Sequence, residues 1–303
     1  MAGGSGALGR RVCDDLAARG HEVVVLTRRR APGPHRQVEW DGARPGSWYD
    51  EVEGSAVVNL AGALVDRRPT PAAVALLTAS RVQPTLALAA AARAVGPLPV
   101  LVQASTAAIY GDGGEAQLDE SSPIGDGPPQ MTAVATAWEA AAAEVPAART
   151  VVLRTSIVLD RNTPALDRLT GVVRWGLGGA IAGGRQWFSW IHVEDWLAVV
   201  RASLGLDEPA WPGPALDGVL LATAPHPVRN AELMRTLRTA LHRPAAPPTP
   251  TPLVRLGSLL LRTDPALALT GRRALPRRLQ EGGFAFRFPE LEPALEDLLS
   301  SRR

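Results

Sequence analysis

Gly3-Gly4-Ser5-Gly6-Ala7-Leu8-Gly9 is the stretch that decides the fold of this 303-residue chain. Gly3, Gly6 and Gly9 stand three residues apart, and a helical pattern follows them at once. In a nucleotide-binding turn, the first glycine permits a sharp turn and the second lets the backbone approach a pyrophosphate. The third lets the new helix pack closely against the sheet. The alternative is a glycine-rich, flexible N-terminus, and the rest of the chain must decide between the two.

The turn lacks the strand that should precede it, because only Met1 and Ala2 come before Gly3. In a doubly wound fold that strand is the central one of the sheet. Omitting it would leave the two neighbouring strands with unpaired N–H and C=O groups. We therefore expect either that Met1 is not the true start, with about six to eight apolar strand residues upstream of it, or that the chain is a truncated product.

Short apolar runs alternate with helical patterns along the first half of the chain. The apolar runs are typical of strands buried on both faces of a parallel sheet, and the segments between them have the length of crossover helices. This alternation predicts a Rossmann-like, doubly wound parallel sheet whose first strand is apparently missing. The expected strands are 22–27, 37–40, 56–62, 98–104 and 150–159, and the expected helices are 10–19, 70–95 and 132–143.

The regular alternation of strands and helices ends after residue 159, which suggests that the parts before and after this residue have different roles. We expect a nucleotide-binding domain over 1–242, with a smaller substrate lobe built mainly from 160–242. Five prolines lie between Arg243 and Pro252 and predict a stiff linker over 243–252. Residues 253–303 then form a C-terminal extension, which could cover the site or make a homodimer contact.

Composition limits the kind of protein and partner. Hydrophobic residues make up 46% of the chain and the net charge is +2, so we expect a real core and no nucleic-acid partner. The single cysteine, Cys13, fits a reducing compartment without a disulfide framework. The histidines have no metal-ligand spacing, no apolar run reaches the ~18 residues of a membrane span, and no signal peptide is visible. We expect a cytoplasmic protein with a small-molecule substrate, no metal and no membrane partner.

A series of short sequence motifs, in order along nearly the whole chain, resembles the motifs of a known protein family. They are Gly3–Gly9, Leu26-Thr27-Arg28, Asn59-Leu60-Ala61-Gly62, Ser80-Arg81, Ala104-Ser105 with Tyr110-Gly111, Trp138-Glu139, residues 153–159 and 183–192, and Gly283-Phe284 with Phe288-Pro289. Together they resemble the extended short-chain dehydrogenase/reductase superfamily. More closely, the chain resembles an atypical epimerase-like branch of the NAD-dependent epimerase/dehydratase family that carries its own C-terminal extension. This resemblance implies a fold and a cofactor more than a reaction.

The residues that follow two expected strands bear on the cofactor. In a dinucleotide fold the residue closing the second strand reads the ribose, where an acid favours NAD and an arginine accommodates the 2′-phosphate of NADP. Here that place falls at Arg28 and Arg29, so we expect NADP rather than NAD, unless both arginines are ordinary surface charges. Leu60, Ala61 and Gly62 end a further strand, where small residues let the backbone pass close to a cofactor.

The catalytic dyad that the resemblance implies is absent from this chain. The superfamily uses a tyrosine with a lysine four residues on, whereas all 32 basic residues here are arginine. A strand-end hydroxyl survives as the catalytic candidate. Counting back from Tyr110 favours Thr106, and the pattern of the branch favours Ser105. Tyr110 itself is a further candidate acid, and Glu139 is either a nearby acid or an ordinary helix carboxylate.

Aromatic residues mark the expected substrate side. We expect Arg185, Trp187, Phe188 and Trp190 to line it, either as an apolar wall for a ligand or as core under the second lobe. Relatives that act on nucleotide sugars usually carry an arginine where Phe188 stands. The departure suggests an apolar or small carbonyl substrate.

Two functions remain open at this point. The first is an NADP-dependent oxidoreductase or epimerase-like enzyme that acts on a small carbonyl or hydroxyl compound without the tyrosine–lysine pair. Hydride transfer needs mainly orientation and a hydroxyl contact, so the loss lowers the activity without forbidding it. The second is a non-catalytic NADP-binding sensor or partner-binding module. The missing pair favours the second function, and the retained hydroxyl and aromatic segment favour the first.

Overall fold

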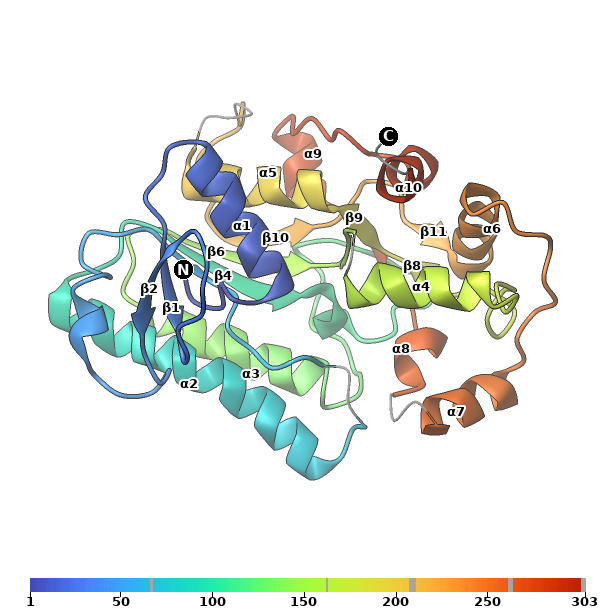
Figure 1. Ribbon diagram of the computed structural model, residues 1–303, viewed down its shortest axis with the longest axis horizontal. Coiled ribbons are helices and arrows are strands. Elements are labelled where there is room, and N and C mark those ends of the chain that lie inside the picture. Colours follow the sequence, from blue (N-terminus) through green and yellow to red (C-terminus); the bar gives the residue numbers. More distant parts are fainter. Residues whose placement is uncertain (66–67, 162, 207–210, 261–263, 301–303) are drawn as a thin grey trace.

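A parallel sheet with helices on both faces forms the centre of the computed structural model, which describes residues 1–65, 68–161, 163–206, 211–260 and 264–300 (Figure 1). Four strands pair in the order β10-β6-β4-β3, and β1 pairs with β2, all in parallel. This confirms the doubly wound sheet that the sequence predicts. The strands are β1 (Val24–Thr27), β2 (Arg36–Glu39), β3 (Val57–Asn59), β4 (Leu101–Thr106), β6 (Thr150–Thr155) and β10 (Gly218–Ala222).

Met1 and Ala2 take the place of the central strand and join the two groups of strands. Ala2 lies between β1 and β3 and bridges both in parallel. Its N–H donates to the Val58 carbonyl, and its carbonyl accepts from the Leu60 N–H, each at 2.9 Å. The Leu26 N–H donates to the Met1 carbonyl at 2.9 Å. Met1 and Ala2 therefore pair with the strands on both sides, and the sheet is continuous at its carboxyl end.

The amino end of the same strands is less well filled. A cavity of about 240 Å³ lies there, and we call it the amino-end cavity. Its apolar wall comes from Leu16, Val24, Val58 and Leu204, and Met1 closes it on the side of the sheet's carboxyl end. The cavity thus lies between β1 and β3, where a longer central strand would continue.

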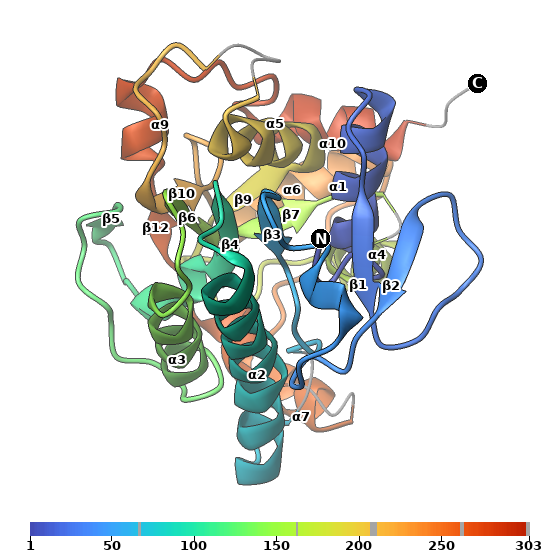
Figure 2. The same cartoon turned by 90° about the vertical axis from the view of Figure 1, so that its left-hand side faces the viewer.

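Helices cover both faces of the sheet, as Figure 2 shows. Leu101 and Val102, successive residues of β4, are both fully buried, and they belong to different clusters of core residues. Because both faces are covered, the strands read as continuous apolar runs rather than as alternating ones. The covering helices are α1 (Ala7–Ala18) and α5 (Val193–Leu204) on one face and α2 (Pro71–Val95) and α3 (Thr132–Ala143) on the other.

Helix α2 is long and apolar enough, by length and composition, to cross a membrane. In the structure it lies on the sheet beside α3 (Figure 2). Leu88, Ala89, Ala91 and Ala92 are buried in the core, with at most 1% of each exposed. Packing against the sheet therefore accounts for most of the apolar residues in the C-terminal half of α2, whereas Leu76 and Leu86 remain exposed.

The segment predicted as one strand over 150–159 is two strands in the structure. β6 ends at Thr155, and β7 pairs with β9 in a separate two-stranded sheet. Between them, the Ser156 N–H donates to the Ala222 carbonyl at 3.1 Å. The elements of this half are β7 (Ile157–Leu159), α4 (Pro164–Arg174), β8 (Trp187–Phe188), β9 (Trp190–His192), β11 (Val228–Arg229) and α6 (Asn230–Ala240).

The C-terminal segment folds back along the rest of the chain (Figure 1). Thr249, inside the expected linker, bridges Ile181, and helix α7 already begins at Thr251. Strand β12 pairs with β5, α9 contacts β10, and α10 contacts α6. The remaining elements are η1 (Ser47–Tyr49), η2 (Ala107–Tyr110), β5 (Gln117–Leu118), α7 (Thr251–Leu260), α8 (Ala266–Leu269), β12 (Arg273–Ala274), α9 (Arg277–Glu281) and α10 (Leu291–Leu299).

Candidate functional site

The glycine turn at the carboxyl end of the sheet is built by close backbone contacts. Gly3 has φ +79°, and a Cβ on it would lie 2.6 Å from the Leu60 carbonyl carbon. A Cβ on Gly9 would lie 2.1 Å from the Gly3 carbonyl oxygen, so α1 could not approach the turn. A Cβ on Gly6 would meet only the Gly3 oxygen, at 3.3 Å. Gly3 and Gly9 are therefore required by packing, whereas Gly6 keeps open the space outside the turn.

The start of α1 fits an anionic group. The turn closes with the Gly6 N–H donating to the Gly3 carbonyl at 3.0 Å, and α1 begins directly after it at Ala7. Gly6 is the N-cap residue, no side chain caps the helix, and its first turn carries no acidic residue. Such a terminus offers backbone N–H groups and a positive dipole end to a pyrophosphate. The residues present thus fit a dinucleotide, and an ordered turn replaces the alternative of a flexible N-terminus.

The two expected cofactor arginines follow β1 directly. Arg28 and Arg29 are exposed, and β1 ends one residue before them, at Thr27. The Thr27 hydroxyl donates to the Arg29 carbonyl at 2.9 Å, which holds the backbone in a turn. Both guanidinium groups therefore project from the same edge of the sheet as the glycine turn.

The turn after β3 is fixed by a buried amide. Asn59 is fully buried, its side-chain NH₂ donates to Thr85 at 2.9 Å, and its oxygen accepts from the Ala61 N–H at 3.1 Å. Gly62 lies against Arg81, whose Cζ would be 3.0 Å from a Cβ at that position. The structure thus brings the residues 60–62 and the glycine turn together, as the sequence predicts.

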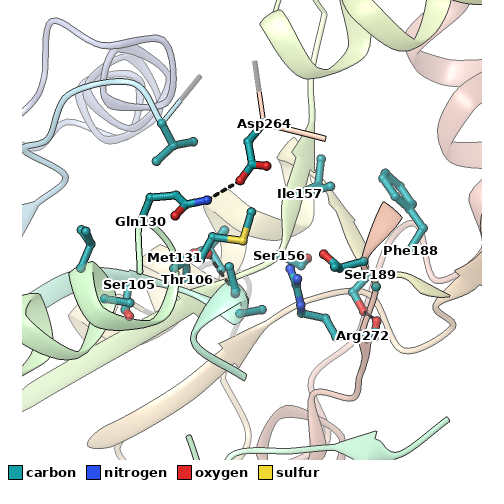
Figure 3. Close-up of a pocket in the computed structure, with 18 of the residues that line it drawn as sticks. Ser105, Thr106, Gln130, Met131, Ser156, Ile157, Phe188, Ser189, Asp264 and Arg272 are labelled. Atoms are coloured by element: carbon teal, nitrogen blue, oxygen red, sulfur yellow. Dashed lines mark hydrogen bonds between the residues drawn. The ribbon is translucent and has the colours of Figure 1, made fainter. Parts of the chain in front are cut away.

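A second cavity, of about 320 Å³, opens at the carboxyl ends of β4 and β6, and Figure 3 shows it. We call it the carboxyl-end cavity. Hydroxyl groups at the strand ends form its floor, apolar side chains of α3 form one wall, and the C-terminal segment closes another. The residues that carry the argument below are Ser105, Thr106, Gln130, Met131, Val134, Ala135, Trp138, Ser156, Trp187, Phe188, Asp264 and Arg272.

Ser105 belongs to a buried network of charged groups. Its hydroxyl donates to Glu139 Oε1 at 2.5 Å, and Arg154 forms two hydrogen bonds to the same carboxylate, at 2.9 and 2.8 Å. The Arg154 and Glu139 side chains are only 8% and 15% exposed. Burial alone would lower the pKa of Arg154, but its bonds to Glu139 and Tyr110 outweigh this and raise the pKa. Glu139 is therefore an ion-paired carboxylate, and the hydrogen bond from Ser105 connects it to the cavity.

Thr106 has a different hydrogen-bond arrangement from its neighbour. Its side-chain oxygen accepts from the Ala108 N–H at 3.1 Å and so caps η2. Within the described chain no acceptor takes the Thr106 hydroxyl hydrogen, and the side chain lines the cavity. Thr106 is thus the strand-end residue with a proton free to donate to a ligand.

Tyr110 lies outside the set of cavity-lining residues. Its hydroxyl donates to the Asp119 carbonyl at 2.8 Å and accepts from Arg154 at 2.9 Å. Burial raises the pKa of this phenol, so it stays protonated. With both hydrogen-bonding roles filled, Tyr110 holds the charged network in place and does not face a substrate.

The expected substrate residues divide into two groups. Trp187 and Phe188 line the carboxyl-end cavity. Trp190 is fully buried and donates from Nε1 to the His226 carbonyl at 3.2 Å, so it belongs to the core. Arg185 is exposed and outside the cavity lining. The aromatic segment therefore supplies a wall at 187–188 and core at Trp190.

Sequence reasoning missed the residues that the C-terminal segment brings to the cavity. Asp264 accepts from the Gln130 side chain and, at 2.9 Å, from the Ala266 N–H. Figure 3 shows the Gln130–Asp264 bond across one side of the cavity and the Arg272 guanidinium pointing toward Ser156. In the sequence Arg272 stands out only as part of a short basic pair, with no spacing that links it to the strand ends.

Family models match two parts of the chain. Residues 1–209 match the model described as the NAD dependent epimerase/dehydratase family, and residues 249–298 match a domain of unknown function, DUF1731. A relative from Bos taurus, the epimerase family protein SDR39U1, is 34% identical over 307 residues, with 99% of each chain covered.

Solved structures show the same architecture. The human epimerase family protein SDR39U1 (isoform 2), whose crystal structure contains NADPH, is 32% identical with a TM-score of 0.82. The match covers 98% of this chain and 97% of the human one. A nucleoside-diphosphate sugar epimerase from Corynebacterium glutamicum is 27% identical with a TM-score of 0.77, over 98% of this chain and 57% of its own.

Proposed function

The chain belongs to the NAD-dependent epimerase/dehydratase family, and from that membership we propose an NADP-dependent oxidoreductase or epimerase-like enzyme acting on a small carbonyl or hydroxyl compound. One observation carries the proposal: the Ser105 and Thr106 hydroxyls line a cavity at the same sheet edge as the glycine turn. In open α/β sheets this edge is where cofactor and substrate meet.

The choice of NADP over NAD rests on two supports. Arg28 and Arg29 follow β1, where a planar guanidinium can bind a 2′-phosphate through two parallel hydrogen bonds. The human relative at 32% identity was crystallised with NADPH. With the glycine turn at the pyrophosphate, Leu60, Ala61 and Gly62 would lie alongside the cofactor.

The residues at the strand ends can replace the missing dyad in handling a proton. A bound NADPH supplies a hydride to a carbonyl carbon of the substrate. Thr106 donates a hydrogen bond to the carbonyl oxygen and stabilises the charge that develops there. In the oxidative direction, a substrate hydroxyl gives its proton to Ser105 as Ser105 gives its own proton to the Glu139 carboxylate, which Arg154 holds in place by two hydrogen bonds.

A non-catalytic NADP-binding sensor or partner-binding module is the second candidate. The observation in its favour is the apolar surface that α3 and its N-cap residue turn to the cavity, formed by Met131, Val134, Ala135 and Trp138. No ionisable side chain of α3 takes the place of the lost tyrosine or lysine on this wall. The module would bind NADPH with the same preference over NADH and oxidise none of it.

Fluorescence titration with NADPH and NADH tests the cofactor assignment. We expect wild-type protein to bind NADPH at least about tenfold more tightly than NADH, and Arg28→Ala to reduce that ratio to near one. The control is Arg93→Ala, which removes another exposed arginine, in the last turn of α2 and paired with Glu144. Equal millimolar affinity of the wild type for both cofactors would disprove the assignment. NADPH oxidation in a broad screen of carbonyl compounds then separates the enzyme from the module.

A further inference from the structure

We propose that Arg272 of the C-terminal segment binds a carboxylate of the substrate, so that the enzyme acts on a short oxo acid or hydroxy acid. The inference rests on the proposed function, since it names the substrate class of the same cavity. It also assigns a role to the segment 249–298, which matches a domain of unknown function.

The backbone around Arg272 is fixed before any ligand arrives. Gly271 packs so closely on Trp187 that a Cβ would lie 2.4 Å from the Trp187 carbonyl oxygen. The Arg272 N–H donates to that same carbonyl at 3.3 Å, and the Arg272 carbonyl accepts from the Ser189 hydroxyl at 2.7 Å. β12 then begins at Arg273. The arginine is therefore preorganised on the cavity wall, which lowers the cost of binding a ligand.

The guanidinium of Arg272 makes no ion pair with another described residue, although Asp112 lies near enough to act on its charge. Its Nε donates to the Gly111 carbonyl at 2.9 Å. Among the described residues no carboxylate lies within ion-pairing distance of it, and the neighbouring Asp112 accepts from the Gly271 N–H instead. Burial lowers the pKa of Arg272, because the charged form has lost water, and the negative charge of Asp112 opposes this effect only in part. The two terminal nitrogens point into the cavity toward Ser156 (Figure 3).

A second arginine on the cavity wall, Arg81, has a structural role, because its guanidinium bonds to the backbone of the protein. Arg81 donates to the Leu77 carbonyl at 3.1 Å and to the Ala63 carbonyl at 3.0 Å, so both terminal nitrogens serve the fold. Its guanidinium also lies 5.1 Å from the Trp138 ring centroid. In Arg272 only Nε is used in this way, which leaves its forked end for a ligand.

The size and charge of the cavity favour a small carboxylate over a nucleotide diphosphate. About 320 Å³ must hold the reactive end of a cofactor as well as the substrate. One guanidinium end offers two parallel N–H groups and a single positive charge, which match the two oxygens and one charge of a carboxylate.

Calorimetric titration of the NADPH-loaded protein with matched aromatic probes tests the proposal. The probes are benzoate, the neutral benzamide of similar size, and phenyl phosphate. We expect benzoate to bind at least about tenfold more tightly than benzamide, and more tightly than phenyl phosphate. Equal affinity of benzoate and benzamide would overturn the proposal, and so would a preference for phenyl phosphate. These probes need no turnover, so their result is separate from that of the carbonyl screen.

Variants of Arg272 and of a control arginine test whether Arg272 causes the preference for benzoate over benzamide. Arg272→Gln should reduce the benzoate-to-benzamide affinity ratio to near one while NADPH affinity stays unchanged. The control Arg277→Gln removes a charge of the same segment that is 61% exposed and paired with Asp119, and it should keep the ratio. An unchanged ratio in Arg272→Gln would refute the assignment. If that variant does not fold, the wild-type ratio alone decides, together with Arg272→Lys, which keeps the charge but loses the fork and should bind benzoate more weakly.

Discussion

The two ends of the same parallel sheet each carry a cavity, and only the one at the carboxyl end lies where open α/β sheets bind their ligands. At the carboxyl end, hydroxyls of Ser105 and Thr106 and the guanidinium of Arg272 line a space of about 320 Å³. At the amino end, a space of about 240 Å³ lies between β1 and β3, beside Met1, and both apolar and polar side chains line it. The volumes differ little, so volume alone does not identify a site.

What separates the two cavities is the state of their polar groups. At the carboxyl end, a donor hydrogen on Thr106 and the forked end of Arg272 face the space without a partner in the described chain. At the amino end, the Met1 ammonium donates to the Val24 carbonyl at 2.8 Å and the Glu51 carboxylate accepts from Arg36 at 2.7 Å, while His21 and Glu22 also line the space. The carboxyl-end cavity therefore offers unused donors at the sheet edge where ligands bind, and we expect the amino-end cavity to affect stability instead. Changes at the carboxyl end should therefore alter activity, and changes at the amino end should alter stability.

The largest effect is expected from Thr106→Val. This change keeps the shape of the side chain but removes the hydroxyl, so the developing charge on the substrate oxygen loses its donor. We expect kcat/KM to fall by about 10²–10³-fold with whichever carbonyl compound the wild type reduces. NADPH affinity should stay the same. Thr106→Ser is the matched control and should retain most of the activity; undiminished turnover by Thr106→Val would place the donor elsewhere.

The glycine turn offers a sharper contrast within the carboxyl end. Gly9→Ala would force a Cβ to 2.1 Å from the Gly3 oxygen, and we expect the free energy of unfolding to fall by about 3 kcal/mol. Gly6→Ala meets only the Gly3 oxygen, at 3.3 Å, so stability should change by less than about 1 kcal/mol. Its methyl group would occupy the approach of the pyrophosphate and lower NADPH affinity about tenfold. Urea unfolding and NADPH titration of both variants measure the two effects. The prediction would be wrong if both variants lost mainly stability, or if both lost mainly NADPH affinity.

The smallest effect is expected at the amino-end cavity. Adding Val-Ile-Val directly before Met1 would extend the central strand into the space between β1 and β3. Burial of apolar side chains should exceed the cost of ordering them, and we expect a gain of about 1 kcal/mol in the free energy of unfolding. NADPH affinity should not change. A Ser-Gly-Ser extension is the control, and equal stability of the two extended proteins would show that the cavity does not accept a strand.

Much of the fold could be predicted because β1, β3, β4, β6 and β10 are short, mainly apolar runs that are largely buried in the sheet. The exception is instructive: residues 150–159 read as one run, yet the chain leaves the sheet at Ser156. Both strands on either side of that residue are apolar, so the pattern contains no sign of the break. The short central strand was equally hard to foresee, because pairing through Met1 and Ala2 depends on the spacing between β1 and β3.

The candidate site was only partly predictable. Ser105 and Thr106 follow from their place at a strand end, and the structure separates them by what each hydroxyl is bonded to. Trp187 and Trp190 look alike in the sequence, but only the first reaches the cavity. Arg272 reaches it through pairing between β12 and β5, two strands of two residues each, and so short a pairing leaves no periodic signal.

The fold-back of the C-terminal segment has a consequence for how the protein is made. The glycine turn and the strand-end hydroxyls leave the ribosome before Asp264 and Arg272, because Arg272 follows Thr106 by 166 residues. A nascent chain could thus form much of its nucleotide-binding half while the wall bearing Arg272 is still absent. The order of translation therefore delays completion of the cavity until the segment that carries Arg272 has emerged.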